Sequence, residues 1–316
     1  MKRWTTWAAC LIGLSAFLLT PIHTSAVDYG DRTNLMQLQS TSEAAAIPDA
    51  TISLQPRSES TLTATVNAWK TTLSRERGFE LWQQAQWNSY PLGPGTHGWV
   101  VILQANGQEV GYMIVHATDN GSLRLTEYGT GDNPLFSLTT LYRSLVQQEL
   151  IPAATSLTDF VSNEQIMKER LYMDSFTAIW KIQMHQQTHY LDAKSGELLP
   201  LDHDPVPQQA AANSAGTVLT GKLDDLLLPV FDPYDRLPWV QGKPLQIVDL
   251  PELKAALKKK DKLTYVIDLY NHKVTMPLAV LGYKQWNGGQ PYLAVDHVGT
   301  RYVLLREALR QGRIYP

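Results

Sequence analysis

Two histidines, His185 and His189, lie four residues apart, and Asp192 follows closely. On a helix this spacing would place both imidazoles on one face, where they could bind zinc. The segment is instead typical of a β-hairpin with Gln186 and Gln187 at its bend, and it lacks the glutamate that follows the first histidine in metalloproteases. We therefore interpret both histidines as the polar rim of a hairpin and expect neither a metal nor a cofactor.

Four aspartates near two prolines form the next group of possible metal ligands: Asp224, Asp225, Asp232 and Asp235. Calcium requires about six to eight oxygen ligands, which an EF-hand supplies at fixed spacings around a sharp turn. That spacing is missing here. A calcium site is therefore not expected.

Acyl-transfer chemistry has little support in the residue pattern. The G-x-S-x-G motif of serine hydrolases is absent, and Ser195, between Lys194 and Gly196, suits an ordinary turn. Glu127 and Asp132 flank a glycine-rich stretch and are the best carboxylates for a hydrolytic pair, although a pair is recognised by its separation in space. We expect both carboxylates to lie in a loop and to be exposed to water.

The N-terminus has the three parts of a secretory signal peptide. Lys2 and Arg3 precede twelve uncharged residues at 8–19, and small residues end at Ala26. A membrane-spanning helix needs about 20 apolar residues, so we expect cleavage after about Ala26 and contact with a membrane only during export. The only cysteine, Cys10, is lost with this segment. The expected product is a cysteine-free protein that is secreted or associated with the cell wall.

The charge balance is mildly acidic. The chain has 27 basic and 30 acidic residues, and because residues 1–26 contain two bases and no acid, the exported part has a net charge of −5. Proteins that bind nucleic acid usually present a basic face, which is absent here, so we expect no nucleic-acid partner. The single lysine run at 258–262 is interpreted as a solvated helix end.

The pattern of elements predicts an α+β fold with two domains, each a mainly antiparallel sheet with packed helices. Residues 27–59 resemble a flexible leader. In the first domain, 60–201, apolar residues first repeat at helical spacing, which predicts a helix. Strands are then predicted on either side of Asn106-Gly107, a pair that favours a tight hairpin turn. A helix is expected at 138–150, and a second hairpin at 178–193.

Residues 202–216 are the predicted linker, because they are rich in proline and small residues and lack apolar periodicity. The second domain, 217–316, is expected to be smaller. Asp249 and Glu252 form a capping-box pair that predicts a helix start. Strands are predicted at 263–270, 278–286, 292–296 and 301–304, before a final helix that ends near Gly312.

Residues 178–200 resemble the hairpin of PepSY-type domains, which occur in protease propeptides and envelope proteins. The resemblance rests on an aromatic-aliphatic strand, on Tyr190-Leu191-Asp192-Ala193 and on Ser195-Gly196-Glu197. It implies inhibition or chaperoning of a secreted protease rather than catalysis.

Residues 231–316 are similar to the last strands of papain-like peptidases of the bacteriocin-processing type. PLAVLGY at 277–283 and the strand that ends at Asp296 match, whereas the catalytic histidine falls at about Met276 and the cysteine has no counterpart. The resemblance implies a degenerate relative that keeps a peptide groove. Candidate binding residues are the aromatic side chains near turns and the polar residues at the matching strand end: Trp239, Tyr283, Trp286, Asp296 and His297.

These observations favour an exported, non-catalytic protein that modulates a secreted protease or binds peptide, with no catalytic residue assigned. An exported hydrolase that uses carboxylate or histidine groups is the first alternative. A structural component of the cell envelope or spore is the second.

Overall fold

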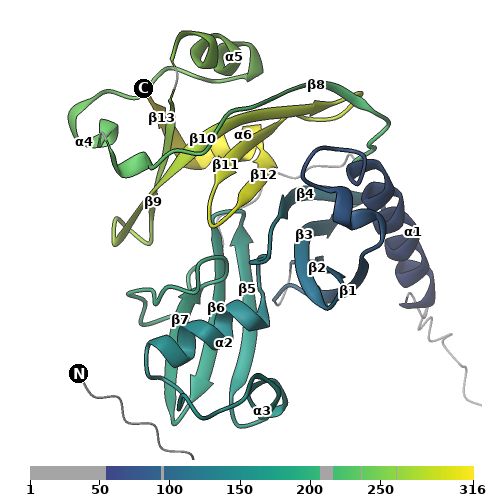
Figure 1. Cartoon of the computed structure of the whole chain (residues 1–316), viewed down its shortest axis with the longest axis vertical. Coiled ribbons are helices and arrows are strands. Elements are labelled where there is room, and N and C mark those ends of the chain that lie inside the picture. The colour runs from purple at the N-terminus through teal and green to yellow at the C-terminus, as the bar shows by residue number, and fades with distance from the viewer. Residues whose placement is uncertain (1–54, 94–95, 207–215, 236, 261) are drawn as a thin grey trace, which may run out of the picture. The chain divides into compact units, whose positions relative to one another are not determined.

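The computed structural model describes residues 55–93, 96–206, 216–235, 237–260 and 262–316. The predicted signal peptide and most of the predicted leader therefore lie outside the described residues. The first helix begins at Gln55, inside the segment expected to be a leader. Residues 53–316 group into one compact unit with an α+β fold (Figure 1).

The N-terminal part is an antiparallel sheet covered on one face by helix α1 (Gln55–Leu73) and the short helix η1 (Glu80–Gln83). Helix α1 buries one stripe at helical spacing, namely Leu62, Val66, Trp69 and Leu73. The four strands of this part are β1 (Gln86–Pro91), β2 (Gly98–Ala105), β3 (Gln108–Ala117) and β4 (Leu123–Thr130). Burial of this stripe against the sheet holds the helix in place.

The turn between β2 and β3 confirms the predicted hairpin. Asn106 has φ 53° and Gly107 has φ 76°, so both turn residues adopt the left-handed conformation that a two-residue hairpin turn requires. Asparagine and glycine tolerate this conformation best, which explains why the pair is a strong local signal.

The other face of this sheet is covered by helix α2 (Leu138–Gln147), helix α3 (Leu157–Ser162) and a three-stranded antiparallel sheet. The strands of that second sheet are β5 (Met167–Asp174), β6 (Thr177–Met184) and β7 (Gln187–Asp192). The predicted hairpin is present, but its bend lies at His185 and Gln186, both with positive φ, one residue earlier than expected.

The C-terminal part adds six strands, three α-helices and one short 3-10 helix to the fold. Its elements are β8 (Lys222–Leu227), η2 (Pro233–Asp235), α4 (Pro238–Gln241), α5 (Leu250–Lys259), β9 (Thr264–Leu269), β10 (Val274–Trp286), β11 (Tyr292–Asp296), β12 (Thr300–Leu304), α6 (Leu305–Gln311) and β13 (Gly312–Tyr315). Asp249 caps α5 by accepting a hydrogen bond from the Glu252 amide at 3.0 Å, as the sequence predicts. The Glu252 carboxylate reaches back to the amide of Val248 at 2.7 Å.

The main sheet continues across the predicted domain boundary. Its strand order is β1-β2-β3-β4-β12-β11-β10-β9-β13, with β8 paired to β10. The junction is the antiparallel pairing of β4 with β12, in which Glu127 lies opposite Val303. The two predicted domains therefore share one sheet, and residues 207–215 of the predicted linker lie outside the described part of the chain.

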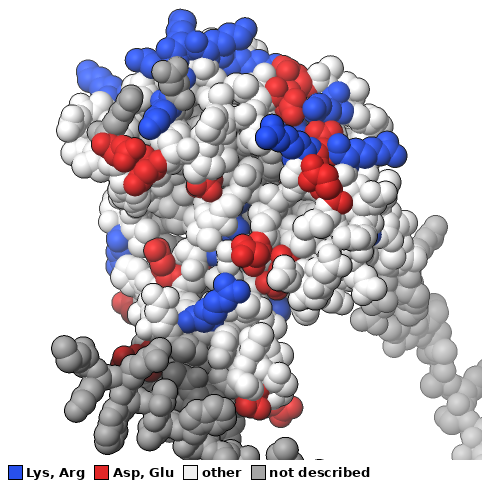
Figure 2. Space-filling model, in the orientation of Figure 1, with Lys and Arg blue, Asp and Glu red and all other residues white. Residues whose placement is uncertain are grey.

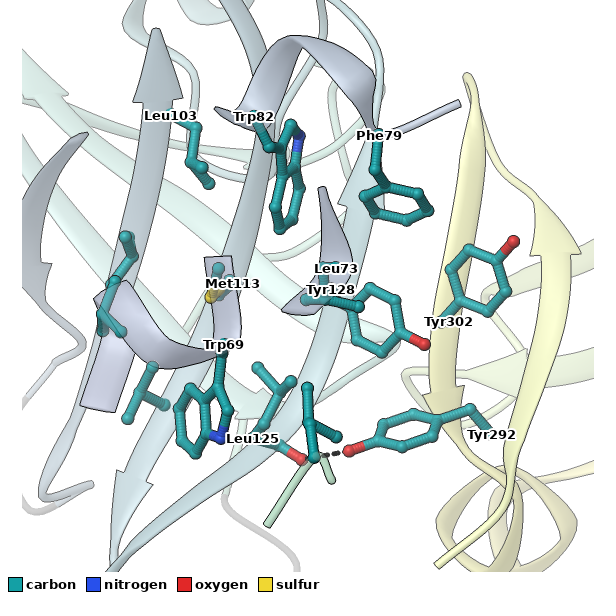
Figure 3. Packing of buried hydrophobic residues seen from close by; sticks show 14 of the residues in the cluster. Trp69, Leu73, Phe79, Trp82, Leu103, Met113, Leu125, Tyr128, Tyr292 and Tyr302 are labelled. Atoms are coloured by element: carbon teal, nitrogen blue, oxygen red, sulfur yellow. Dashed lines mark hydrogen bonds between the residues drawn. The ribbon is translucent and has the colours of Figure 1, made fainter. Parts of the chain in front are cut away.

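An aromatic cluster packs over this junction (Figure 3). Tyr128 of β4 stacks on Tyr302 of β12 with ring centroids 4.8 Å apart, and both rings contact Phe79. Tyr292 of β11 donates a hydrogen bond to the carbonyl of Leu125 at 2.8 Å. Because this cluster takes residues from both parts, its burial stabilises them as one structure.

On the face shown in Figure 2, lysine and arginine side chains gather over α5 at the top, while both signs mix elsewhere. Lys258 and Lys259 are exposed in the last turn of that helix, where cations are favourable. Within the described residues, no helix combines the length and hydrophobicity that crossing a membrane would need.

Candidate binding site

A buried ionic network lies where β4 meets β12. The Arg301 guanidinium donates to Glu127 Oε1 from Nε at 3.0 Å and from Nη2 at 2.6 Å. Glu127 is 0% exposed and Arg301 is 1% exposed. The expectation that Glu127 is a solvated loop carboxylate is therefore wrong, because this residue lies within β4 and points into the protein.

Further polar groups complete the coordination of this pair. Tyr112 donates to Glu127 Oε1, and Tyr172 donates to Oε2 at 3.4 Å. Arg301 also donates to the carbonyl of Ser175. A buried charge pair is tolerated only when such hydrogen bonds replace the lost water. The network thus connects β3, β4, β5 and β12 in one buried site.

His297 extends the network toward the three-stranded sheet. Its Nδ1 lies 2.6 Å from Arg301 Nη1 and, facing a cation, acts as the acceptor, so Nε2 carries the proton. Nε2 lies 4.0 Å from Asp192 Oδ1. Burial lowers the pKa of His297 to about 3, and the Arg301 charge also lowers it. His297 is therefore a neutral, buried link within this network.

Asp192 and Lys194 hold the adjacent turn. Asp192 Oδ1 accepts from the amides of Lys194 at 2.9 Å and Ser195 at 2.7 Å. Lys194 Nζ donates to the carbonyls of Val298, at 3.0 Å, and Asn133. Burial lowers the pKa of Lys194 to about 7. This lysine therefore joins three loops through carbonyl contacts that suit either of its protonation states.

A cleft of about 260 Å³ opens beside this network. Its lining includes His116 of β3, Thr126 of β4 and Tyr172 of β5, and also Ser175 and Gln311. Tyr172 and Ser175 belong to both the cleft and the network. Three larger hollows lie near Tyr270, between α2 and the turn at 195–198, and beside the hairpin bend at His185. Their linings include none of Glu127, Tyr172, Ser175 and Arg301. We therefore take this cleft as the candidate site.

Several residues that line the cleft are polar and uncharged, among them His116, Thr126 and Tyr172. His116 Nδ1 lies 3.1 Å from Thr126 Oγ1, and its ring is 5.5 Å from that of Tyr172. Burial lowers the pKa of His116 to about 4, and Arg124 contributes. At neutral pH this imidazole therefore has one donor and one acceptor.

The rim of the cleft carries charges of both signs. Arg310 donates to Glu307 at 3.0 Å, and Arg124 lies 3.9 Å from the same carboxylate. Asp174 Oδ1 accepts from the amide of Phe176 at 2.9 Å, and burial raises its pKa. A zwitterionic rim around a neutral interior suits a ligand with dipoles, such as a peptide group, better than a multiply charged anion.

Gln311 is the least satisfied polar residue of the cleft. Its amide nitrogen and amide oxygen are both buried without a hydrogen-bond partner. Leaving such groups unpaired costs roughly 1–3 kcal/mol. Gln311, which lines the cleft, therefore keeps donor and acceptor capacity that no protein group uses, on a planar amide like that of a peptide group. Sequence reasoning missed Gln311, because nothing in the final helix distinguishes it from a surface glutamine.

Ser175 of the cleft is not paired with a catalytic base. The Ser175 hydroxyl lies 3.2 Å from the phenol of Tyr172, whose pKa is raised well above its ordinary value by burial and by Glu127. A neutral phenol at neutral pH cannot accept the serine proton as a catalytic base does. The arrangement can bind by hydrogen bonds but does not activate Ser175.

The five residues predicted to bind ligand do not form one surface. Trp286 is 1% exposed, and its Nε1 donates to Tyr128 OH at 3.3 Å. Tyr283 is 7% exposed and donates to Asp224 at 3.1 Å. Asp296 accepts from the amide of Gly299 at 3.2 Å. Trp239 is half-buried against Tyr234. Each of them therefore has a structural contact inside the protein.

The possible metal ligands are also dispersed. His185 is exposed at the hairpin bend, and His189 lies opposite Ile182 in the ladder of β6 and β7. Asp224 pairs with Lys254 at 2.6 Å. Throughout the described part of the chain, no three histidine, cysteine, aspartate or glutamate side chains are grouped as a metal site requires.

The comparisons with known proteins identify no relative of this chain. No protein-family model matches the chain, and searches of curated proteins and of solved structures also find no match.

Proposed function

We propose that the exported chain is a non-catalytic binding protein that takes a peptide segment in the cleft beside His116 and Gln311, and that a secreted protease is its partner. The observation that carries this proposal is the unpaired amide of Gln311. A peptide group presents one N–H and one C=O, so it can satisfy both atoms at once. We choose a protease as the partner because the hairpin at 178–200 resembles that of PepSY-type domains, which occur in protease propeptides.

The titratable groups that could serve catalysis support the same proposal. Glu127 is bound by Arg301, and His297 by Arg301 as well. Asp296 closes a turn through Gly299. These contacts leave the side chains without the freedom that proton transfer to a substrate requires.

The proposal is tested by mixing the purified exported chain with the secreted proteases of the organism that produces it. We expect a complex in pull-down assays and a changed rate of protease action on a casein substrate. Absence of both would remove the hypothesis. Hydrolysis of casein by the chain alone would favour the hydrolase alternative instead.

Replacing Gln311 with leucine separates binding from folding. Gln311→Leu removes a buried unpaired amide while keeping a similar volume, so we expect the free energy of unfolding to rise by about 1–2 kcal/mol. The same change is expected to weaken protease binding at least about tenfold, which corresponds to one lost pair of hydrogen bonds.

Urea unfolding and a pull-down titration check both expectations for Gln311→Leu. The matched control is Gln108→Leu, at the exposed first position of β3, which should shift stability by less than about 0.5 kcal/mol and leave binding intact. A Gln311→Leu protein that is less stable than the wild type would show that the amide already has a partner.

A further inference from the structure

Strand β1 is an open edge of the main sheet. Three other sheet edges carry backbone hydrogen bonds from neighbouring segments: Leu245 N to Ile314 O at 2.8 Å on β13, Leu199 N to Tyr190 O at 2.7 Å on β7, and Gly93 N to Arg170 O at 2.8 Å on β5. Strand β8 has a register shift, and Lys254 of α5 reaches its Asp224. In the part of the chain that the structure describes, the outer side of β1 has no such backbone partner.

The outward backbone groups of β1 follow from its ladder with β2. The amide of Leu92 donates to the carbonyl of Gly98 at 2.9 Å, and alternate residues of an antiparallel strand bond to the same neighbour. Tyr90 and Asn88 therefore face β2, and Trp87 and Ser89 point their N–H and C=O groups outward. These two residues offer two donors and two acceptors to an added strand.

The edge lacks the devices that usually block strand addition. Proteins protect an edge with charged side chains, bulges or proline. The sequence of β1, QWNSYP, contains no charge, its register with β2 is unbroken, and its only proline is the last residue, Pro91. Strand β1 therefore carries none of these obstacles to β-augmentation.

Arg170 places an unpaired cation beside this edge. Its guanidinium lies 4.4 Å from the ring of Tyr90, on β1, and 4.8 Å from the ring of Trp180. Among the described residues it has no carboxylate partner, and its Nε has no hydrogen bond. Arg301 and Arg310, in contrast, each bind a carboxylate. An arginine held between two rings and free of acids is complementary to a carboxylate from another molecule.

We propose that β1 binds an extended segment of a partner polypeptide as an added strand, and that an acidic side chain of this segment pairs with Arg170. This surface shares no residue with the cleft. It therefore defines a second, independent contact for a polypeptide partner, recognised by backbone pairing and by one carboxylate.

The test uses the full exported chain and two fluorescent peptides, TVEVTV and its glutamine analogue TVQVTV. Fluorescence anisotropy at about 0.15 M salt, where surface charges are screened beyond about 8 Å, gives the two dissociation constants. We expect the wild type to bind the glutamate peptide about tenfold more tightly, because one charge-assisted hydrogen-bonded pair distinguishes the two peptides. Arg170→Gln should abolish this difference.

The contribution of the backbone is isolated at Ser89. Ser89→Pro removes an outward N–H and leaves the bonds to β2 intact, so it should weaken both peptides at least about tenfold. Ser89→Ala keeps the N–H and should bind like the wild type. Melting temperatures of both variants show whether the proline also affects folding, and Arg170→Gln keeps the proposal testable if it does.

Several results would overturn the proposal. They are equal affinities of the wild type for the two peptides, equal affinities of Ser89→Pro and Ser89→Ala, and an absence of peptide binding. Self-association that Ser89→Pro abolishes would assign the edge to a second copy of the chain. Loss of TVEVTV binding in Gln311→Leu would assign the peptide to the cleft, whereas unchanged binding in that variant supports a separate site.

Discussion

Replacing Arg301 with methionine is expected to lower the free energy of unfolding by about 3–5 kcal/mol. The substitution removes the guanidinium that donates twice to Glu127, at 3.0 and 2.6 Å, and leaves a carboxylate that is 0% exposed without its counter-charge. It also frees the acceptor nitrogen of His297. Urea unfolding at pH 7, followed by tryptophan fluorescence, measures the change.

Two control proteins separate the buried charge from the loss of packing. The double variant Glu127→Leu with Arg301→Met removes both charges, and we expect it to recover a large part of the lost stability, because an apolar pair needs no counter-charge. Arg310→Met breaks the more exposed pair with Glu307, 3.0 Å apart, and should cost less than about 1 kcal/mol. A double variant no more stable than Arg301→Met would contradict an electrostatic origin.

Acidification from pH 6.5 to pH 4 is expected to destabilise the protein through His116 and His297. Burial lowers the pKa of His116 to about 4 and that of His297 to about 3, below their ordinary value of 6.5. In this window the unfolded chain binds protons on both imidazoles while the folded chain leaves them neutral. The free energy of unfolding therefore falls with pH, with a slope approaching 1.4 kcal/mol per pH unit for each histidine. Above pH 6.5 both states are neutral, and the histidines add no pH dependence.

The variant His116→Gln with His297→Asn isolates this effect from the titration of carboxylates. Those carboxylates are common to both proteins, so the difference between the two slopes reports the histidines alone. We expect the variant to be less stable at pH 7, because it loses polar contacts, but to lose less stability per pH unit between 6.5 and 4. Urea unfolding at half-unit intervals gives both slopes. Identical slopes would mean that the histidines are protonated in the folded chain.

Local sequence patterns determined most of the individual elements. Leu62, Val66 and Trp69 repeat at helical spacing, and α1 buries this stripe. Asn106-Gly107 makes the predicted hairpin turn, and Asp249 caps α5. The α+β class follows from the same signals. Each of these features depends on residues within a few positions of one another, so the sequence contains their physical cause directly.

The assembly of those elements was not predictable from the same patterns. The linker predicted at 202–216 divided the chain into two domains, each with its own sheet, whereas β4 pairs with β12 and the main sheet continues through the junction. Period-two alternation identifies a strand but not its neighbour. Pairing between distant strands depends on the whole packed structure, in which Tyr128 and Tyr302 stack.

The candidate site depended even more on tertiary structure. By sequence, Glu127 was a loop carboxylate and His297 a candidate binding residue, and Arg301 and Gln311 carried no signal. The contact between Arg301 and Glu127 joins residues 174 positions apart. By itself, the sequence determined helices, hairpins, a helix cap and the fold class. Tertiary structure alone decided which polar side chains are buried together, because burial and charge pairing are set by residues that are distant along the chain and close in space.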